Sequence, residues 1–308
     1  MDDRNLRALL CSGMIAGAGP LIASSAVAQG VVGGALPSRL AARIAAAPAR
    51  AVGVYFRDLT TGDSALVGAH LRFHAASTMK VPVMIQLFRD RDAGLLSLDD
   101  SITVTNTFRS IVDSSTYQLD KADDSDSSLY ARVGGKAAIR ELVELMETVS
   151  SNLATNLLIA RVGAPRANAT AHALGADSIV VLRGVEDGKA YRAGRNNTTT
   201  ARDLGVLLAA IADGRAASPA AAREMLAILG RQQFNEGIPA GLPPGEGTRV
   251  YHKTGWIGGV VYHDAAIVER MDGRRYVLVV LTGGIQKDED AYGLVRDLSR
   301  LVYDRVVK

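Results

Sequence analysis

A serine and a lysine stand three residues apart in Ser77-Thr78-Met79-Lys80, at the start of a segment whose apolar residues have helical spacing. Residues i and i+3 share one face of a helix, so the lysine amine can lie beside the serine hydroxyl. A lysine that is partly desolvated and close to other cations has a lowered pKa and can act as a base toward serine. The N–H groups at the helix start could also stabilise an oxyanion. These residues predict a serine nucleophile, although a surface lysine one turn from an N-cap serine would give the same pattern.

A second polar group, Ser150-Ser151-Asn152, lies between two segments with helical patterns. In a bend, the Ser150 hydroxyl and the Asn152 amide can point into one cleft. The hydroxyl can relay a proton there, and the amide can hold a substrate amide oxygen. Taken alone, the three residues are better explained by ordinary helix capping.

A third group, Lys253-Thr254-Gly255, follows strand-like residues. Lysine and threonine on a strand edge can bind a carboxylate, and glycine lets a substrate backbone approach closely. The backbone N–H of Trp256, the next residue, could be the second oxyanion donor. The three groups occur in order, each on the kind of element that its role needs, which is much less probable by chance than any one of them.

Strand-like segments lie toward both ends of the chain, and helical patterns fill its middle. Strands are expected over 51–56, 65–67, 249–253, 258–269 and 275–282, and helices over 36–47, 77–91, 134–148, 152–162, 200–213, 219–230 and 288–307. The simplest architecture is one antiparallel sheet shared by both ends and covered by the terminal helices. Residues 29–74 and 234–308 would form this α/β lobe and residues 75–233 an inserted all-α lobe, with the site in a cleft between them.

The motifs S-x-x-K, S-x-N and K-T-G resemble the signature of penicillin-recognising serine enzymes, and the layout from about residue 36 to residue 308 is similar to class A β-lactamases. The run from Ser150 to Leu158 and the threonines 198–200 extend the similarity. The resemblance implies a three-layer fold with an α/β and an all-α part, and no metal or organic cofactor. It also implies acylation of Ser77 by a β-lactam or by a D-Ala-D-Ala-like amide.

The resemblance further implies a role for each matching residue. Lys80 and Ser150 would handle protons, and the N–H groups of Ser77 and Trp256 would form the oxyanion hole. The substrate would be bound by Asn152, Lys253 and Thr254, with Gly255 against it.

Several positions depart from the family pattern. Ser151 replaces an aspartate of S-D-N, so the bonds that brace this motif must be made differently. The E-x-x-L-N stretch that carries the deacylating glutamate is missing, and Glu186, twelve residues before Thr198, is the best candidate for that base. An equally weighted alternative is a loop carboxylate paired with an arginine: Arg183, Arg192 or Arg195. Asn197 stands where such enzymes place a loop-pinning aspartate. The stretch 108–130 is longer than usual, and its acidic part, 120–128, is expected to be a solvated loop.

Composition and charge limit the other possibilities. The chain of 308 residues has 35 Lys+Arg against 32 Asp+Glu, an excess too small for a nucleic-acid binder. The single cysteine, Cys11, cannot form an internal disulfide. The five histidines form no H-E-x-x-H pattern or close pair, so no metal site is expected.

Residues 1–28 have the pattern of a secretory signal peptide. Arg4 and Arg7 precede an apolar stretch, and Ala26-Val27-Ala28 fits a cleavage site. No later segment is apolar and long enough to span a membrane. We therefore expect a periplasmic or secreted monomer that is not bound to a membrane after cleavage.

Together these features predict an exported serine hydrolase that opens β-lactam rings through a Ser77 acyl-enzyme. The alternatives are a D,D-peptidase or esterase with the same nucleophile, or a penicillin-binding protein that is acylated without turnover.

Overall fold

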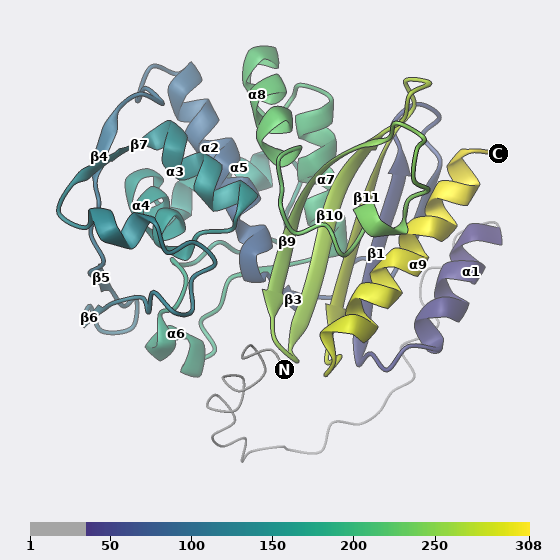
Figure 1. Cartoon of the computed structure of the whole chain (residues 1–308), viewed down its shortest axis with the longest axis horizontal. Coiled ribbons are helices and arrows are strands. Elements are labelled where there is room, and N and C mark those ends of the chain that lie inside the picture. The colour runs from purple at the N-terminus through teal and green to yellow at the C-terminus, as the bar shows by residue number, and fades with distance from the viewer. Residues whose placement is uncertain (1–34) are drawn as a thin grey trace.

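A five-stranded antiparallel sheet is the centre of the structure, a computed structural model that describes residues 35–308. The predicted signal peptide lies outside these residues. The strand order is β2-β1-β11-β10-β9 (Figure 1). The strands are β1 (Ala51–Asp58), β2 (Ser64–Val67), β9 (Arg249–Ile257), β10 (Val261–Glu269) and β11 (Arg275–Gly283). The predicted sheet shared by the two ends of the chain is confirmed, since Ala51 of β1 pairs with Gly283 of β11.

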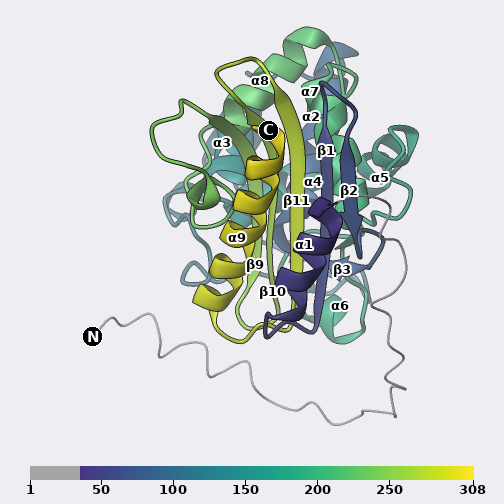
Figure 2. The same ribbon diagram turned by 90° about the vertical axis from the view of Figure 1, so that its right-hand side faces the viewer.

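Side chains alternate between the two faces of this sheet, as the period of two requires. Val54 and Val280 point to the face that is covered by the terminal helices α1 (Ala35–Ala45) and α9 (Asp288–Val306), which Figure 2 shows in front of the strands. Tyr55 and Val279 point to the opposite face, where α7 (Ala201–Ala212) packs. The fold is thus three layers: helices, sheet, helices.

The middle of the chain supplies a group of helices beside the edge strand β9 (Figure 1). They are α2 (Lys80–Asp92), α3 (Ile139–Thr148), α4 (Asn152–Val162), α5 (Ala164–Ala173), α6 (Gly188–Arg192) and α8 (Pro219–Leu229). Helix α2 contacts α3, α4, α5 and α8, and its residues from Lys80 to Phe88 are all buried. The helix that follows the predicted nucleophile is therefore the packed centre of the helical part.

Two predicted helix starts are wrong. In place of a helix over 134–148, a short strand β7 (Lys136–Ala138) pairs with β4 (Ser101–Thr103), and α3 begins at Ile139. Gly134 has φ of 90°, a conformation that a right-handed helix cannot contain. The first turn of the helix expected over 77–91 is instead the 3₁₀ helix η2 (Ala76–Met79), so that α2 begins at Lys80.

The sequence patterns also missed some short elements. Helix α5 has no apolar side chain other than alanine and proline, so it lacks the stripe that reveals a helix. The two-residue strands β3 (Phe73–His74) and β8 (Thr198–Thr199) pair with each other, as do β5 (Phe108–Arg109) and β6 (Thr116–Tyr117). Over residues 35–308, no helix has the length and hydropathy that a bilayer crossing needs.

Candidate active site

Ser77 lies half-buried in the η2 turn, directly before α2 and in contact with β9. The preceding residue, Ala76, has a left-handed conformation (φ 45°), which is strained for a residue with a Cβ. Two hydrogen bonds hold this strained turn. The Ala76 N–H donates to Nδ1 of His74 (3.0 Å), and the Ala75 N–H donates to the carbonyl of Asn197 (2.9 Å).

Lys80 is fully buried at the first position of α2, and its amine points to the second motif. Its Nζ donates to the carbonyl oxygen of Ser150 (2.7 Å), to Ser150 Oγ (3.0 Å) and to Asn152 Oδ1 (3.1 Å). Burial, and then the nearby charge of Lys253, hold the pKa of Lys80 well below its usual range, and carboxylates offset only part of this. The lowered pKa makes the neutral, proton-accepting form of this amine easier to reach than in an exposed lysine.

Lys253 reaches the same hydroxyl from the sheet. Its Nζ donates to Ser150 Oγ (3.0 Å) and to the carbonyl of Thr254 (3.1 Å), and burial lowers its pKa. A serine oxygen has two lone pairs and can accept from both lysines. The proton of the Ser150 hydroxyl then stays available for another acceptor.

Gly255 lies where β9 passes the nucleophile. A Cβ at this position would come within 3.2 Å of the Ser77 backbone nitrogen and 3.1 Å of Thr78 Cγ2, so a side chain here would push the strand and the turn apart by a few tenths of an ångström. Thr254 is buried beside it, whereas the Trp256 side chain is 55% exposed and its Nε1 donates to Asp288 (3.0 Å). The third motif is thus packed directly against the first.

Glu186 joins this cluster through Asn152. Nδ2 of Asn152 donates to Glu186 Oε1 (2.7 Å), while its Oδ1 faces the Lys80 amine. Burial is the main cause that raises the pKa of Glu186 to about 7. The hydrogen bond from Asn152 lowers the pKa, and the charges of nearby aspartates raise it. Two of the three arginines proposed as its partners bond elsewhere: Arg183 donates to Gly184, Arg195 and Asn196, and Arg195 donates to Ile111.

Asn197 closes the base of the loop that carries Glu186, by bonding to residues 182 and 183. Its Oδ1 accepts from the N–H groups of Leu182 (2.7 Å) and Arg183 (3.0 Å), and its Nδ2 donates to the carbonyl of Arg183 (2.9 Å). The neutral side-chain amide of Asn197 therefore joins the two ends of this loop by hydrogen bonds and without an ion pair.

Asp124, which the sequence did not single out, braces the second motif. Its carboxylate accepts from the N–H groups of Asn152 (2.9 Å) and Leu153 (2.8 Å) at the start of α4, and from the Tyr130 hydroxyl (3.0 Å). Ser151 is buried and caps α4 by accepting from the Ala154 N–H. The loop predicted to be solvated is thus anchored by Asp124 and also by Ser125, whose hydroxyl donates to the carbonyl of Val149. Asp124 and Ser151 together brace the second motif. Nothing in the acidic run 120–128 marks this aspartate in the sequence.

Glu147, also missed, is a buried carboxylate in the last turn of α3. Among the described residues neither of its side-chain oxygens has a hydrogen-bond partner. Burial raises its pKa, and the charges of Lys253 and Lys80 oppose the shift. The Glu147 carboxylate therefore interacts electrostatically with both lysines of the site.

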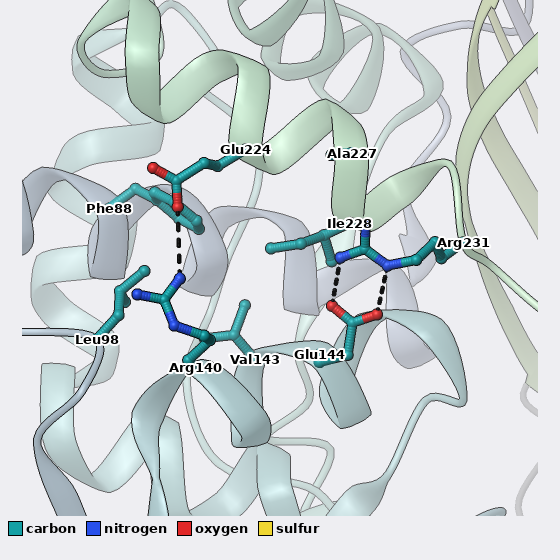
Figure 3. A pocket seen from close by; sticks show the side chains of 9 residues that line it. All are labelled: Phe88, Leu98, Arg140, Val143, Glu144, Glu224, Ala227, Ile228 and Arg231. Atoms are coloured by element: carbon teal, nitrogen blue, oxygen red, sulfur yellow. Dashed lines mark hydrogen bonds and ion pairs between the residues drawn. The ribbon is translucent and has the colours of Figure 1, made fainter.

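A separate hollow of about 220 Å³ lies between α2, α3 and α8 (Figure 3). Its floor is apolar, and Arg140 and Arg231 at its rim face Glu224 (3.8 Å) and Glu144 (2.6 Å). Because these carboxylates already neutralise the arginines, the described residues of the hollow offer no unpaired positive charge to bind an anionic substrate. Residues 35–308 hold no cluster of three or more His, Cys, Asp or Glu side chains suited to a metal ion.

The sequence matches the model of the beta-lactamase enzyme family over residues 35–306. The chain therefore belongs to the beta-lactamase enzyme family, and its fold is that of the serine hydrolases in this family. No curated protein sequence matches it.

Three solved structures show the range of its relatives. The chain is similar to a PBP-A mutant in an acyl-enzyme complex with penicillin G (30% identity, TM-score 0.75, covering 88% of this chain and 96% of PBP-A). It is similar to the beta-lactamase from Sphaerobacter thermophilus DSM 20745 (29% identity, TM-score 0.75, covering 88% and 97%). It is also similar to a mutant of the class A beta-lactamase of the last common ancestor of Gram-negative bacteria (26% identity, TM-score 0.76, covering 89% and 99%).

We predict that the hydrogen bonds of Asp124 stabilise the folded protein. Asp124→Ala removes a charged acceptor from two N–H groups at a helix start, which should lower the free energy of unfolding by about 1–2 kcal/mol. Asp124→Asn keeps an acceptor oxygen and should cost less. Urea denaturation followed by circular dichroism measures both. Asp123→Ala, at an exposed neighbour in the same loop, is the control; equal loss in Asp123→Ala and Asp124→Ala would contradict the bracing.

Proposed function

We propose that the chain is a class A-like β-lactamase, which opens the β-lactam ring through an acyl-enzyme on Ser77 and releases the product by hydrolysis. The observation that carries this proposal is the carboxylate of Glu186, held by Asn152 beside the Lys80 amine. A site that only needs to be acylated requires the nucleophile and its base. A site that turns over also requires a base for water.

Acylation uses the first two motifs. Lys80, as the neutral amine, takes the proton of the Ser77 hydroxyl while the serine oxygen bonds to the lactam carbonyl carbon. The N–H groups of Ser77 and Trp256 stabilise the oxyanion. As the lactam C–N bond breaks, Ser150 gives its proton to the leaving nitrogen and recovers one from Lys80, to which it is hydrogen-bonded.

Substrate binding uses the remaining residues of the cluster. Lys253 and Thr254 hold the carboxylate of the drug, with Gly255 leaving room for its backbone, and the Asn152 amide holds the side-chain amide. The substrate is thus a small anionic amide, a chemistry that fits the lysine-rich centre of the site.

Deacylation uses Glu186. Its carboxylate takes a proton from a water molecule, and the resulting hydroxide attacks the ester carbonyl. The bond to Ser77 then breaks as the serine oxygen regains the proton held by Glu186, which returns the carboxylate to its ionised form. The proposed base is ionised only above its raised pKa of about 7.

A second candidate is a D,D-peptidase or esterase with the same nucleophile, or a penicillin-binding protein that is acylated without turnover. The similarity to PBP-A, at an identity close to that of the lactamase from Sphaerobacter thermophilus, favours this alternative. The lifetime of the acyl-enzyme separates the candidates.

The nucleophile is tested by turnover of a chromogenic cephalosporin. The purified protein should hydrolyse it, and Ser77→Ala should abolish hydrolysis. Lys80→Ala should slow acylation by about 10²–10⁴-fold, because general-base help is lost. Equal rates in wild type and Ser77→Ala would contradict the assignment.

The deacylating base is tested by pH dependence. Since Glu186 must be deprotonated, the deacylation rate should fall as the pH drops through about 7 and level off above it. Glu186→Gln should slow deacylation by about 10²–10⁴-fold and remove this step in the profile. Intact-protein mass spectrometry after mixing with penicillin G follows the adduct. An adduct that disappears equally fast from Glu186→Gln and wild type would rule out Glu186 as the base.

We also propose that the protein is exported to the periplasm or secreted, since a signal-like segment precedes the described residues. Expression in a Gram-negative host should release a periplasmic protein whose first residue is Gln29, as determined by mass spectrometry. Recovery of an uncleaved chain in the cytoplasm would contradict export.

A further inference from the structure

The hairpin of β5 and β6, residues 108–117, lies beside the segment that carries Glu186 (Figure 1). The hairpin precedes that segment by about seventy residues, and no catalytic motif falls within it. Its contacts with the segment 183–195 are polar, numerous and in part buried.

Asp187, the residue after Glu186, makes the buried contacts. Its side chain is almost inaccessible to solvent. Oδ1 accepts from the Ser110 hydroxyl (2.9 Å) and from the Ala190 N–H (3.0 Å), and Oδ2 accepts from the Ile111 N–H (3.0 Å). One carboxylate thus ties the hairpin to the Glu186 loop and caps the first turn of α6.

Bonds at the rim add to this link. Lys189 Nζ donates to Asp113 (2.7 Å) and to Ser115 (2.6 Å), and Arg195 donates to the carbonyl of Ile111 (2.7 Å). Ion pairs that are exposed to this degree contribute little to stability. The buried Asp187 carboxylate therefore dominates the outer attachment.

The inner side of the same loop is held by α4. Asn156 Oδ1 accepts from the Val185 N–H (2.6 Å), and its Nδ2 donates to the Val185 carbonyl (3.1 Å). The Tyr117 hydroxyl of the hairpin donates to that carbonyl as well (3.3 Å). The hairpin thus holds Asp187, and α4 and the hairpin together hold Val185.

Glu186, between these two anchors, has a left-handed conformation with φ of 61°. A residue with a long side chain keeps such a conformation only where its neighbours enforce it. The carboxylate of this strained residue bonds Asn152, and the anchors at Val185 and Asp187 oppose relaxation to a right-handed conformation.

We propose that the hairpin 108–117 is a clip that holds Glu186 in its hydrolytic position, and that Asp187 is the positioning residue through which the clip acts. This inference rests on the proposed function, because it assigns the clip to the deacylation step. Ser77, Lys80 and Ser150 lie on other elements, and in residues 35–308 no hydrogen bond joins their side chains to the clip. Loss of the clip therefore impairs deacylation and spares acylation.

The test separates the two steps in Asp187→Ala. Stopped-flow absorbance with a chromogenic cephalosporin gives the acylation rate, and intact-protein mass spectrometry with penicillin G gives the adduct lifetime. Deacylation should slow by about 10²-fold, the loss expected when a catalytic group is displaced by about 1 Å. Acylation should stay within about threefold of wild type. Asp187→Asn, which retains an acceptor oxygen, should recover part of the loss, and Ser110→Ala is the milder probe if Asp187→Ala does not fold.

Asp58→Ala is the matched control. Asp58 is also a buried carboxylate that accepts from two backbone N–H groups, those of Thr60 (2.7 Å) and Thr61 (2.9 Å), but it lies at the end of β1 in the sheet. Asp58→Ala should lower thermal stability without lengthening the adduct lifetime. The clip is overturned if Asp187→Ala deacylates normally, if both rates fall together, or if Asp58→Ala shows the same selective loss.

Glu186→Gln, measured alongside, distinguishes the two levels of the hypothesis. If deacylation is slow in Glu186→Gln but normal in Asp187→Ala, only the clip is overturned. If deacylation is fast in Glu186→Gln, Glu186 is not the base, and the clip then has no role in deacylation.

Discussion

Two buried lysine amines that donate to one serine oxygen are the constraint on which the site depends. Lys80 comes from the start of α2, Ser150 from the bend before α4, and Lys253 from the edge strand of the sheet. Burying two like charges so close together is unfavourable unless polar partners and counter-charges surround them. Asn152, the Ser150 carbonyl and the nearby carboxylates meet that need. The helices must therefore dock against β9 in one register, and the absence of a side chain at Gly255 favours the close approach.

The sequence predicted those parts of the molecule whose signal is local. Periodicity located the strands and most helices, and the spacing of the motifs brought Ser77, Lys80, Ser150, Asn152 and Lys253 onto suitable elements. The bracing carboxylates were not predictable in this way. Asp124 is one of several aspartates in an acidic run, and Asp187 looks like any loop residue. Their roles come from contacts with N–H groups that are distant in the sequence. Such contacts produce no periodic pattern and no bias in composition from which they could be predicted. The wrong helix start at residue 134 has a local cause, since helix propensity was extended through a glycine with positive φ.

Backbone strain is concentrated in the site. Four non-glycine residues of the described chain have positive φ, and three of them are Ala76, Ser150 and Glu186. Each is next to, or is itself, a residue of the proposed mechanism. Local conformational preference yields to function at these points. The Ala76 N–H donates to His74, Lys80 donates to the Ser150 carbonyl, and Asp187, next to Glu186, accepts from the Ile111 N–H; these bonds keep the strained segments in place. Site geometry here is a property of the supporting contacts as much as of the motifs.

The union of both chain ends in one sheet sets the order in which the molecule can be assembled. β2 directly follows β1 in the chain and can pair with it early, but the other edge of β1 has no partner until β11 is made, more than two hundred residues later. Such distant pairing is slow and leaves an unpaired strand edge in the meantime. The helices around α2 can form before that, yet Lys253 reaches Ser150 only when the last strands are in place. A partly made chain can therefore carry the nucleophile without its electrostatic partner, and chemical competence arrives together with the final strands.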